Sequence, residues 1–431
     1  MVEERQLEQF ANRGYDVLDK IRALDPSVSL SMSIGIGRGA RTLREAQDMA
    51  EHALDMAQGR GGDQAAEMTL DGFTFYGGVS HGVEKRSKVR SRLVADQLVK
   101  LIKEADHVVI MGHRMSDLDA IGAAEGVLRI CKICDVPAVI AVRRDATLAA
   151  SLIDALCKAG QKDDFIDPKD ALPIISKRTL CIVVDTYQAG LVESKDILEK
   201  CGKVAVIDHH RKGVGYIENP ALVCHEPYSS SASELVTEFL QYVGDRDDKP
   251  SRVEAEGLLS GIMLDTRDFT LHTGVRTFEA AAALRRYGAE TERVRQLFDV
   301  TMVEYNAKAD LVEKAQMYKN CAISIGGEVA PEARVAIAQA ANDLLRIQGV
   351  DASFVAVQVG NGVNVSARSM GAVNVQVIME SLGGGGHQTM AAAQLKHITP
   401  QAARSRIQDA IDQYYLSQKK TTPEARPAKG E

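Results

Sequence analysis

The sequence predicts an α/β protein whose main domain is built on a parallel, doubly wound sheet. Short runs rich in β-branched residues alternate with helical patterns, as expected for strands joined by crossover helices. These runs are 107–112, 138–142, 179–185 and 203–208. The length of 431 residues exceeds one ordinary domain. Strand-like runs such as CAISIGG and SFVAVQV predict a second, smaller α/β domain over 320–416.

The segment before the sheet divides into an N-terminal piece, residues 1–75, and a helix within 76–106. The piece shows a helical pattern at 3–24, one or two strands, and an Ala-rich helix at 42–58. Such a small core leaves apolar surface exposed, which predicts self-association, such as a homodimer. The following helix is basic and amphipathic, and we interpret it as a linker with a solvated charged face.

The C-terminal part of the chain is predicted to contain three segments. The main domain, 107–300, ends in a mostly helical section, and a connecting helix, 301–319, leads to the second domain. The tail, 417–431, is rich in Lys, Thr and Pro and has no apolar anchors, which predicts disorder.

Composition restricts the classes of partner. The net charge of −7 does not indicate a surface that wraps long nucleic acid, and the absence of Trp disfavours a channel of stacking rings. No apolar run approaches the ~18–20 residues that cross a bilayer. The seven cysteines are scattered singly, as expected for reduced thiols. We therefore expect a cytoplasmic chain that takes a small ligand.

Carboxylate and imidazole side chains gather where the predicted strands end. They are His113, Asp117 and Asp119 after the first strand, Asp185 after the third, Asp208, His209 and His210 after the fourth, and Asp265 after a later helix. Ligands of open parallel sheets bind outside the carboxyl ends of the strands. Crowded carboxylates disfavour joint ionisation, and a divalent cation removes that cost. Mixed oxygen and imidazole donors suit Mn²⁺, with Fe²⁺, Co²⁺ or Mg²⁺ as substitutes.

The number and spacing of these residues favour two metals that share a ligand. Asp117 and Asp119 would point about 200° apart on a helix, but at a loop-to-helix entry they reach neighbouring ions, with Asp185 as the bridge. Each feature alone is weak, because Asp is an ordinary helix cap and a DHH tripeptide recurs by chance. Their joint occurrence, in this order and at strand ends, indicates a two-metal site. Two divalent ions that share a water would lower its pKa, which predicts hydrolysis of a phosphodiester or phosphoanhydride.

The ordered set resembles the DHH phosphoesterase superfamily, which includes manganese pyrophosphatases, single-strand exonucleases and small-oligonucleotide phosphodiesterases. The resemblance covers 107–270 for the catalytic domain and 320–395 for the DHH-associated domain. It implies one Mn²⁺ held by His113, Asp117 and Asp185, and another held by Asp119, Asp185, His209 and Asp265. It also implies two catalytic residues, His210 facing the substrate phosphate and Asp208 orienting the histidine pair.

The second domain carries a glycine-rich run followed by a histidine. A run of glycines by itself is typical of a flexible loop, but with SARS upstream it resembles the part of the DHH-associated domain that grips a distal nucleotide. The substrate-binding residues implied are Ser366, Arg368, Gly384, Gly385, Gly386 and His387. The run PYSSSASELV, at 227–236, is interpreted as a serine-capped helix start.

The N-terminal piece, from SMSIGIG to GRGGDQ, resembles the C-terminal part of a GGDEF-type domain. The order of that piece, the basic helix, the DHH domain and the associated domain resembles the membrane-anchored cyclic-di-AMP phosphodiesterases. This implies cleavage of cyclic di-AMP to linear pApA, and an anchor to the cell membrane outside the present chain. The alternatives are an oligoribonuclease or pApA hydrolase, and a catalytically silent regulator that binds cyclic dinucleotides.

Overall fold

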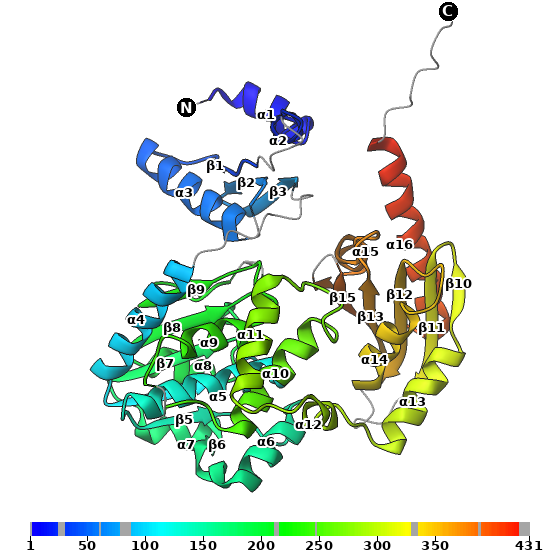
Figure 1. The fold of residues 1–431 in the computed structure, drawn as a ribbon. Helices are drawn as coiled ribbons and strands as arrows, with labels where there is room; N and C mark the ends of the chain where they lie inside the picture. The colour runs from blue at the N-terminus through cyan, green and yellow to red at the C-terminus, as the bar shows by residue number, and fades with distance from the viewer. Residues whose placement is uncertain are drawn as a thin grey trace, which may run out of the picture. The chain divides into compact units, whose positions relative to one another are not determined.

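The structure is a computed structural model that divides the chain into two compact units, Met1–Phe298 and Asp299–Glu431 (Figure 1). The residues that it describes are 2–24, 31–59, 62–77, 88–210, 215–245, 248–328, 335–386 and 389–421. The described part of the first unit contains a three-stranded and a six-stranded sheet, and that of the second unit contains another six-stranded sheet.

The large sheet of the first unit is parallel at every pairing and has the strand order β6-β5-β4-β7-β8-β9. Its strands are β4 (His107–Met111), β5 (Ala138–Ala141), β6 (Phe165–Ile166), β7 (Thr179–Val184), β8 (Lys203–Asp208) and β9 (Leu222–His225). The predicted fold class is confirmed. The two edge strands, β6 and β9, were not predicted, because runs of two and four residues carry too little periodic signal.

Helices cover both faces of this sheet (Figure 1). In β4, Val108 and Ile110 face one core, whereas Val109 and Met111 face the other. The first core also receives α5 (Leu118–Ile133), α6 (Ala150–Leu156), α9 (Ala232–Leu240), α10 (Arg252–Asp265), α11 (Val275–Arg286) and α12 (Thr291–Gln296), and the second receives α7 (Pro168–Ala171) and α8 (Lys195–Lys200). Burial on both faces explains why these strands are continuous apolar runs in the sequence.

The basic helix is α4 (Lys88–Glu104), and it is part of the main domain rather than only a linker. Leu98 and Ile102 are fully buried in the core of the large sheet. Leu93, an apolar residue of the same helix, is 57% exposed. Residues 78–87 of the predicted linker lie outside the described residues.

The N-terminal piece forms a three-stranded sheet, which is more than the one or two strands predicted. Its elements are α1 (Glu4–Asn12), α2 (Val17–Arg22), β1 (Ile34–Gly37), α3 (Leu43–Gly59), β2 (Gln64–Thr69) and β3 (Gly72–Gly77). Strand β1 pairs with β2 in parallel, and β2 with β3 antiparallel. A Cβ at Gly35 would collide with the carbonyl oxygen of Ala50, so glycine lets α3 pack against β1.

The second unit contains a mixed sheet with the order β10-β11-β12-β13-β15-β14. Its elements are α13 (Met302–Glu313), β10 (Gln316–Tyr318), β11 (Cys321–Glu328), α14 (Val335–Leu344), β12 (Ala352–Val359), β13 (Gly362–Ser369), α15 (Val375–Ser381), β14 (Gly385–Gly386), β15 (Met390–Lys396) and α16 (Pro400–Thr421). Two predicted boundaries differ. The connecting segment 301–319 includes β10, and α16 runs five residues into the predicted tail, while 422–431 lie outside the described residues.

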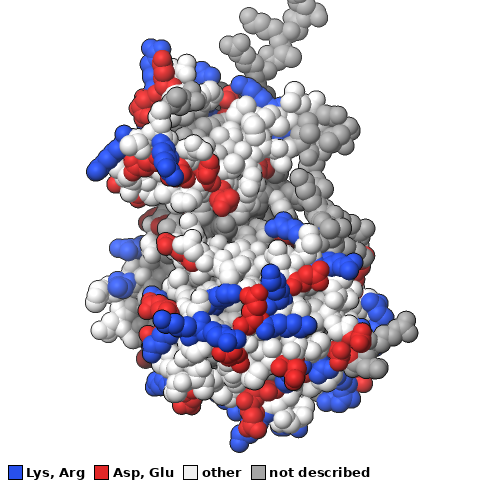
Figure 2. Space-filling view, turned by 90° about the vertical axis from the view of Figure 1, so that its left-hand side faces the viewer, with Lys and Arg blue, Asp and Glu red and all other residues white. Residues whose placement is uncertain are grey.

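On the face shown in Figure 2, Lys and Arg side chains are interspersed with Asp and Glu. Among the helices that the structure describes, none is both long enough and apolar enough to cross a bilayer.

Candidate metal centre

The predicted site residues lie where the order of the large sheet reverses. From β4 the chain leads outward through β5 to β6, whereas from β7 it leads the other way through β8 to β9. Ligands of doubly wound sheets bind at such a switch point, because the loops after the two neighbouring strands diverge there. His113 follows β4, and Asp185 follows β7.

The loop after β4 is held by its own polar groups. His113 Nδ1 donates to the carbonyl oxygen of Arg114 at 2.8 Å, which directs Nε2 toward the carboxylates. Ser116 Oγ donates to the carbonyl oxygen of His113 at 2.6 Å. Asp117 caps α5, and its Oδ1 accepts the N–H groups of Asp119 and Ala120 at 3.0 and 3.2 Å. The helix start thus places Asp117 outside α5 and Asp119 inside it, as the spacing required.

Asp185 lies between the two halves of the site. Its Oδ2 is 3.4 Å from His113 Nε2, and its Oδ1 is 3.3 Å from His209 Nε2. Its φ of 58° is in the left-handed region, which aspartate adopts more readily than most residues. The backbone N–H donates to the carbonyl oxygen of Ile207 in β8 at 2.9 Å, which holds this conformation. A strained backbone of this kind is typical of functional sites.

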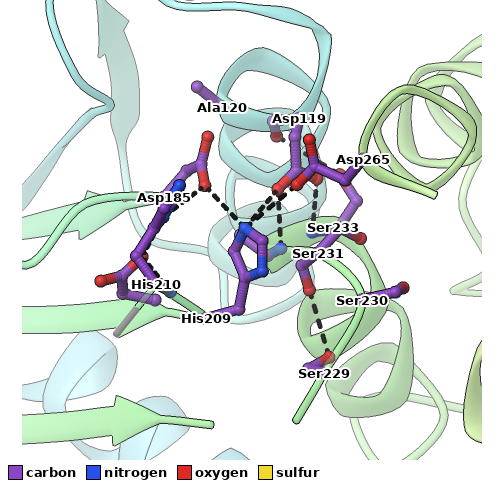
Figure 3. A network of polar contacts seen from close by, with 12 residues as sticks. Asp119, Ala120, Asp185, His209, His210, Ser229, Ser230, Ser231, Ser233 and Asp265 are labelled. Carbon is purple, nitrogen blue, oxygen red and sulfur yellow. Dashed lines mark hydrogen bonds and ion pairs between the residues drawn. The ribbon is translucent and has the colours of Figure 1, made fainter. Parts of the chain in front are cut away.

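His209 is surrounded by carboxylates from three elements (Figure 3). Its Nε2 lies 3.0 Å from Asp265 Oδ2, 3.3 Å from Asp185 Oδ1 and 3.8 Å from Asp119 Oδ2. Although they are buried, His209 Nε2 and Asp185 Oδ1 make no hydrogen bond with any described residue. Buried polar atoms that make no hydrogen bond are rare in proteins, and these two atoms face each other.

The residues predicted as metal ligands come together as two groups that share Asp185. Site A is His113, Asp117 and Asp185, and site B is Asp119, Asp185, His209 and Asp265. Within each group, one possible ligand atom per residue lies within 4.8 Å of the others. A third set with the same property, Asp185, His209 and His210, overlaps site B. The donor chemistry and the unpartnered atoms fit divalent cations in both sites.

Asp208 contacts His210. Its Oδ1 accepts the backbone N–H of His210 at 3.2 Å and lies 2.9 Å from Nδ1. The predicted orienting contact therefore reaches His210, while His209 is held among the carboxylates of site B. His210 Nδ1 also lies 3.4 Å from Asp185 Oδ1.

The electrostatics of the site show how closely the charges are packed. Burial, and then the charges of Asp185 and Asp265, hold the pKa of Asp119 well above its usual value. Burial lowers the pKa of His113, but the nearby carboxylates of Asp117 and Asp185 outweigh it and raise this pKa to about 11. Burial would raise the pKa of Asp185, yet His113 and His209 hold it below its ordinary range. Cationic imidazoles thus balance the carboxylates, and a bound cation would take over that role.

Sequence reasoning missed the groups that hold Asp119. Ser231 caps α9, as predicted for PYSSSASELV. The N–H groups of Ala232 and Ser233 then donate to Asp119 Oδ2 and Oδ1 at 2.7 and 2.9 Å. The serine run signals the helix start, but no local pattern shows that this start meets α5.

In the second unit, the predicted substrate-binding residues lie along neighbouring strands. Arg368 Nη1 donates to Ser366 Oγ at 3.1 Å. Ser366 in β13 pairs with Ala392 in β15, which pairs with Gly385 in β14. A Cβ at Gly384 would collide with the carbonyl oxygen of Ala392, so packing alone requires glycine there. Gly386 pairs with β15 beside Gly385, and His387 lies outside the described residues.

Comparison with known proteins agrees with this fold and with the order of the domains. The model of the DHH family, N-terminal domain, matches residues 107–262, and that of the DHHA1 domain matches 330–416. The chain therefore contains a DHH-family N-terminal domain and a DHHA1 domain. Residues 1–71 match the GGDEF domain model described as cyclic-di-AMP phosphodiesterase GdpP-like.

Two curated relatives match nearly the whole of this chain. Cyclic-di-AMP phosphodiesterase GdpP of Geobacillus thermodenitrificans is 43% identical over 423 residues, and the protein of that name in Bacillus subtilis is 40% identical over 427. Each match covers 96% of this chain, which spans 64% of the relative's length. An exopolyphosphatase-related protein of Bacteroides fragilis has the same fold, with a TM-score of 0.65, 20% identity, and coverage of 76% of this chain and 98% of its own.

Proposed function

We propose that this chain hydrolyses cyclic di-AMP to linear pApA with two divalent cations, Mn²⁺ being the preferred metal. The observation that carries this proposal is Asp185, whose two carboxylate oxygens face the imidazoles of two separate ligand groups. The activity named for the curated relatives supplies the substrate. Water adds to phosphorus, the bond from phosphorus to a ribose 3′ oxygen breaks, and that oxygen takes a proton.

The residues of the first unit divide this work. When bound, two divalent cations supply a water of lowered pKa and stabilise the attacking and leaving oxygens of an in-line displacement. Asp185 would be the ligand common to both sites, and the other residues of sites A and B would complete the two ligand sets. His210, which Asp208 orients, would contact the phosphate that is attacked.

The second unit would select the substrate. Arg368 offers a guanidinium whose geometry suits a phosphate, and Ser366 supports it from the same strand. A Cβ at Gly385 would meet nothing within 4 Å, so this glycine leaves open space for a nucleotide, whereas the corresponding space at Gly386 is filled by Ala391. A substrate with a second phosphate away from the reacting centre would use these contacts, whereas pyrophosphate would not.

The test is a substrate panel. The purified chain is incubated with Mn²⁺ and, separately, with cyclic di-AMP, cyclic di-GMP, pApA and pyrophosphate, and the products are resolved by chromatography. We expect cyclic di-AMP to be lost and pApA to appear, and we expect Co²⁺, Fe²⁺ or Mg²⁺ to support slower turnover. Loss of pyrophosphate with both cyclic dinucleotides intact would contradict the proposal.

Two other outcomes identify the alternatives. Rapid conversion of pApA to AMP with cyclic di-AMP unchanged identifies an oligoribonuclease. Binding of cyclic di-AMP without product under any of the four metal ions identifies a silent regulator. Binding is measured by equilibrium dialysis, so that it is seen independently of turnover.

A further inference from the structure

Glu234 is a buried carboxylate in the first turn of α9, and the proposed reaction does not use it. The residue is 1% exposed. Its Oε1 accepts a hydrogen bond from Ser229 Oγ at 2.8 Å, and its Oε2 accepts from Ser230 Oγ at 2.5 Å and from the Ser230 N–H at 3.3 Å. A buried carboxylate without such donors would be strongly destabilising. The carboxylate and the serine turn therefore hold each other in place.

This turn determines where α9 begins. Ser231 is the cap, and its Oγ accepts the N–H of Glu234 at 3.0 Å. The N–H groups of Ala232 and Ser233 come next, and groups at this position have no acceptor inside the helix. Both donate to the carboxylate of Asp119 on α5, at 2.7 and 2.9 Å (Figure 3).

Three helices meet at Asp119, which leaves its side chain little freedom to turn. Ser233 Oγ from α9 also donates to the carbonyl oxygen of Asp119 at 3.3 Å. Gly261 of α10 lies so close that an added Cβ would collide with Ser233 Oγ and Asp119 Oδ1. One helical turn further along α10 is Asp265 of site B. Rotation of the Asp119 carboxylate would break two hydrogen bonds or press against α10.

We propose that Glu234 is a positioning residue for site B. By holding the turn of Ser229 and Ser230, it keeps the amides of α9 on Asp119, and so keeps that carboxylate in the orientation that binds a cation. The inference rests on the proposed two-metal function, and it assigns Glu234 to one of the two sites. The ligands of site A follow β4 and β7, and the amide hydrogen bonds from α9 reach Asp119 of site B.

The experiment measures Mn²⁺ binding to the full chain by electron paramagnetic resonance of the free ion. Wild type is expected to bind two ions. Glu234→Gln keeps the size of the side chain, but its amide NH₂ is itself a hydrogen-bond donor. It would face the hydroxyl and N–H donors of Ser229 and Ser230 and could not accept from them. Loss of a group that orients a ligand typically weakens metal binding by about 10–100-fold. We expect one ion to bind as in wild type and the other to weaken by that factor.

Glu238→Gln is the matched control. Glu238 lies one turn later on the same helix, and it pairs with Arg276 at 2.7 and 2.8 Å and accepts from Ser91 at 2.7 Å. Its loss removes an ion pair of α9 without touching the serine turn. We expect lower thermal stability and unchanged binding of both ions.

Ser230→Ala is a smaller change that removes one hydrogen-bond donor to Glu234. It tests the positioning role of Glu234 if the Glu234→Gln variant does not fold. We expect it to weaken the same ion by a smaller factor. If the folded Glu234→Gln and Ser230→Ala variants bind both ions as the wild type does, the positioning role of Glu234 is overturned and the two-metal function is not. A wild-type chain that binds no Mn²⁺ would overturn the two-metal function itself, so the two failures are distinguishable.

Discussion

Asp185 Oδ1 and His209 Nε2 face each other at 3.3 Å in the interior of the protein, and neither atom makes a hydrogen bond with a described residue. A carboxylate and an imidazole that lie close together without a hydrogen bond between them are arranged as two ligands of one metal ion. The same carboxylate presents its other oxygen to His113. Asp185 is therefore the residue whose loss should affect both metal sites.

Asp185→Asn should abolish turnover while the fold is retained. Asparagine tolerates the left-handed backbone of this position, but it is a neutral and weaker ligand. Loss of about 4 kcal/mol of transition-state stabilisation corresponds to on the order of 10³-fold in kcat. The measurements are kcat for cyclic di-AMP and the increase in Tm on addition of Mn²⁺, which the variant should lack.

Asp135→Asn is the control, since Asp135 also has a left-handed φ, of 56°, and lies exposed after α5, outside both sites. It should retain wild-type turnover and the Mn²⁺-dependent increase in Tm. Near-wild-type activity in Asp185→Asn would show that the shared-ligand assignment is wrong.

Substitutions of the two neighbouring histidines, His209 and His210, should have different effects on Mn²⁺ binding and on kcat. His209→Asn should weaken binding of one Mn²⁺, because His209 Nε2 faces three carboxylates of site B. His210→Asn should leave both ions bound and lower kcat by about 100-fold, as expected for loss of a group that acts on the reacting phosphate. Mn²⁺ stoichiometry and kcat are measured for both variants. If His210→Asn loses an ion instead, His210 is a ligand, as the set Asp185, His209 and His210 allows.

Arg368→Ala should raise the KM for cyclic di-AMP. A hydrogen bond to a charged group contributes about 1.5–3 kcal/mol, which corresponds to a KM higher by about 10–100-fold. The reacting groups belong to the first unit, so kcat should change less than KM. Arg404→Ala is the control, because Arg404 is an arginine of α16 that bonds to Gln316. Equal KM values for the two variants would exclude Arg368 from substrate binding.

Glu125 should make stability depend on pH. Burial, and then the charge of Glu254, raise the pKa of Glu125 from 4.5 to about 8. Gln161 Nε2 donates to both carboxylates, at 2.6 and 2.9 Å, but Glu125 Oε2 has no partner among the described residues. Because the folded state holds this proton more tightly, the stabilisation is complete below pH 4.5 and is lost as the pH rises toward 8.

The slope from this group is at most about 1.4 kcal/mol per pH unit within that window. The side chain of Glu125→Gln is neutral at every pH, so this variant should lack the dependence of unfolding free energy on pH that Glu125 causes. The free energy of unfolding in urea is measured for the wild type and the variant at pH 6 and at pH 9. The difference between the two proteins at each pH isolates the contribution of Glu125. An equal dependence on pH in both would show that Glu125 is ionised in the folded protein at pH 6.

Much of the fold was predictable because its signals are local. The central strands of the large sheet are buried on both faces, so they are continuous apolar runs in the sequence. The starts of α5 and α9 were predictable from Asp117 and Ser231, since a capping side chain is bonded within its own turn. The edge strands β6 and β9 and the full number of strands in the N-terminal sheet were missed, because short pairings depend on a neighbour that the local sequence does not show.

The sequence by itself determined which side chains stand at the ends of the strands, and so the kinds of ligand available to a metal. Only the tertiary structure decided how these ligands are distributed between the two candidate metal sites. The order of the strands puts Asp185 between His113 and His209, the packing of α9 against α5 puts two amides on Asp119, and the end of β8 joins Asp208 to His210. These contacts join residues brought together by folding, and their distances depend on sheet order and helix packing rather than on local pattern.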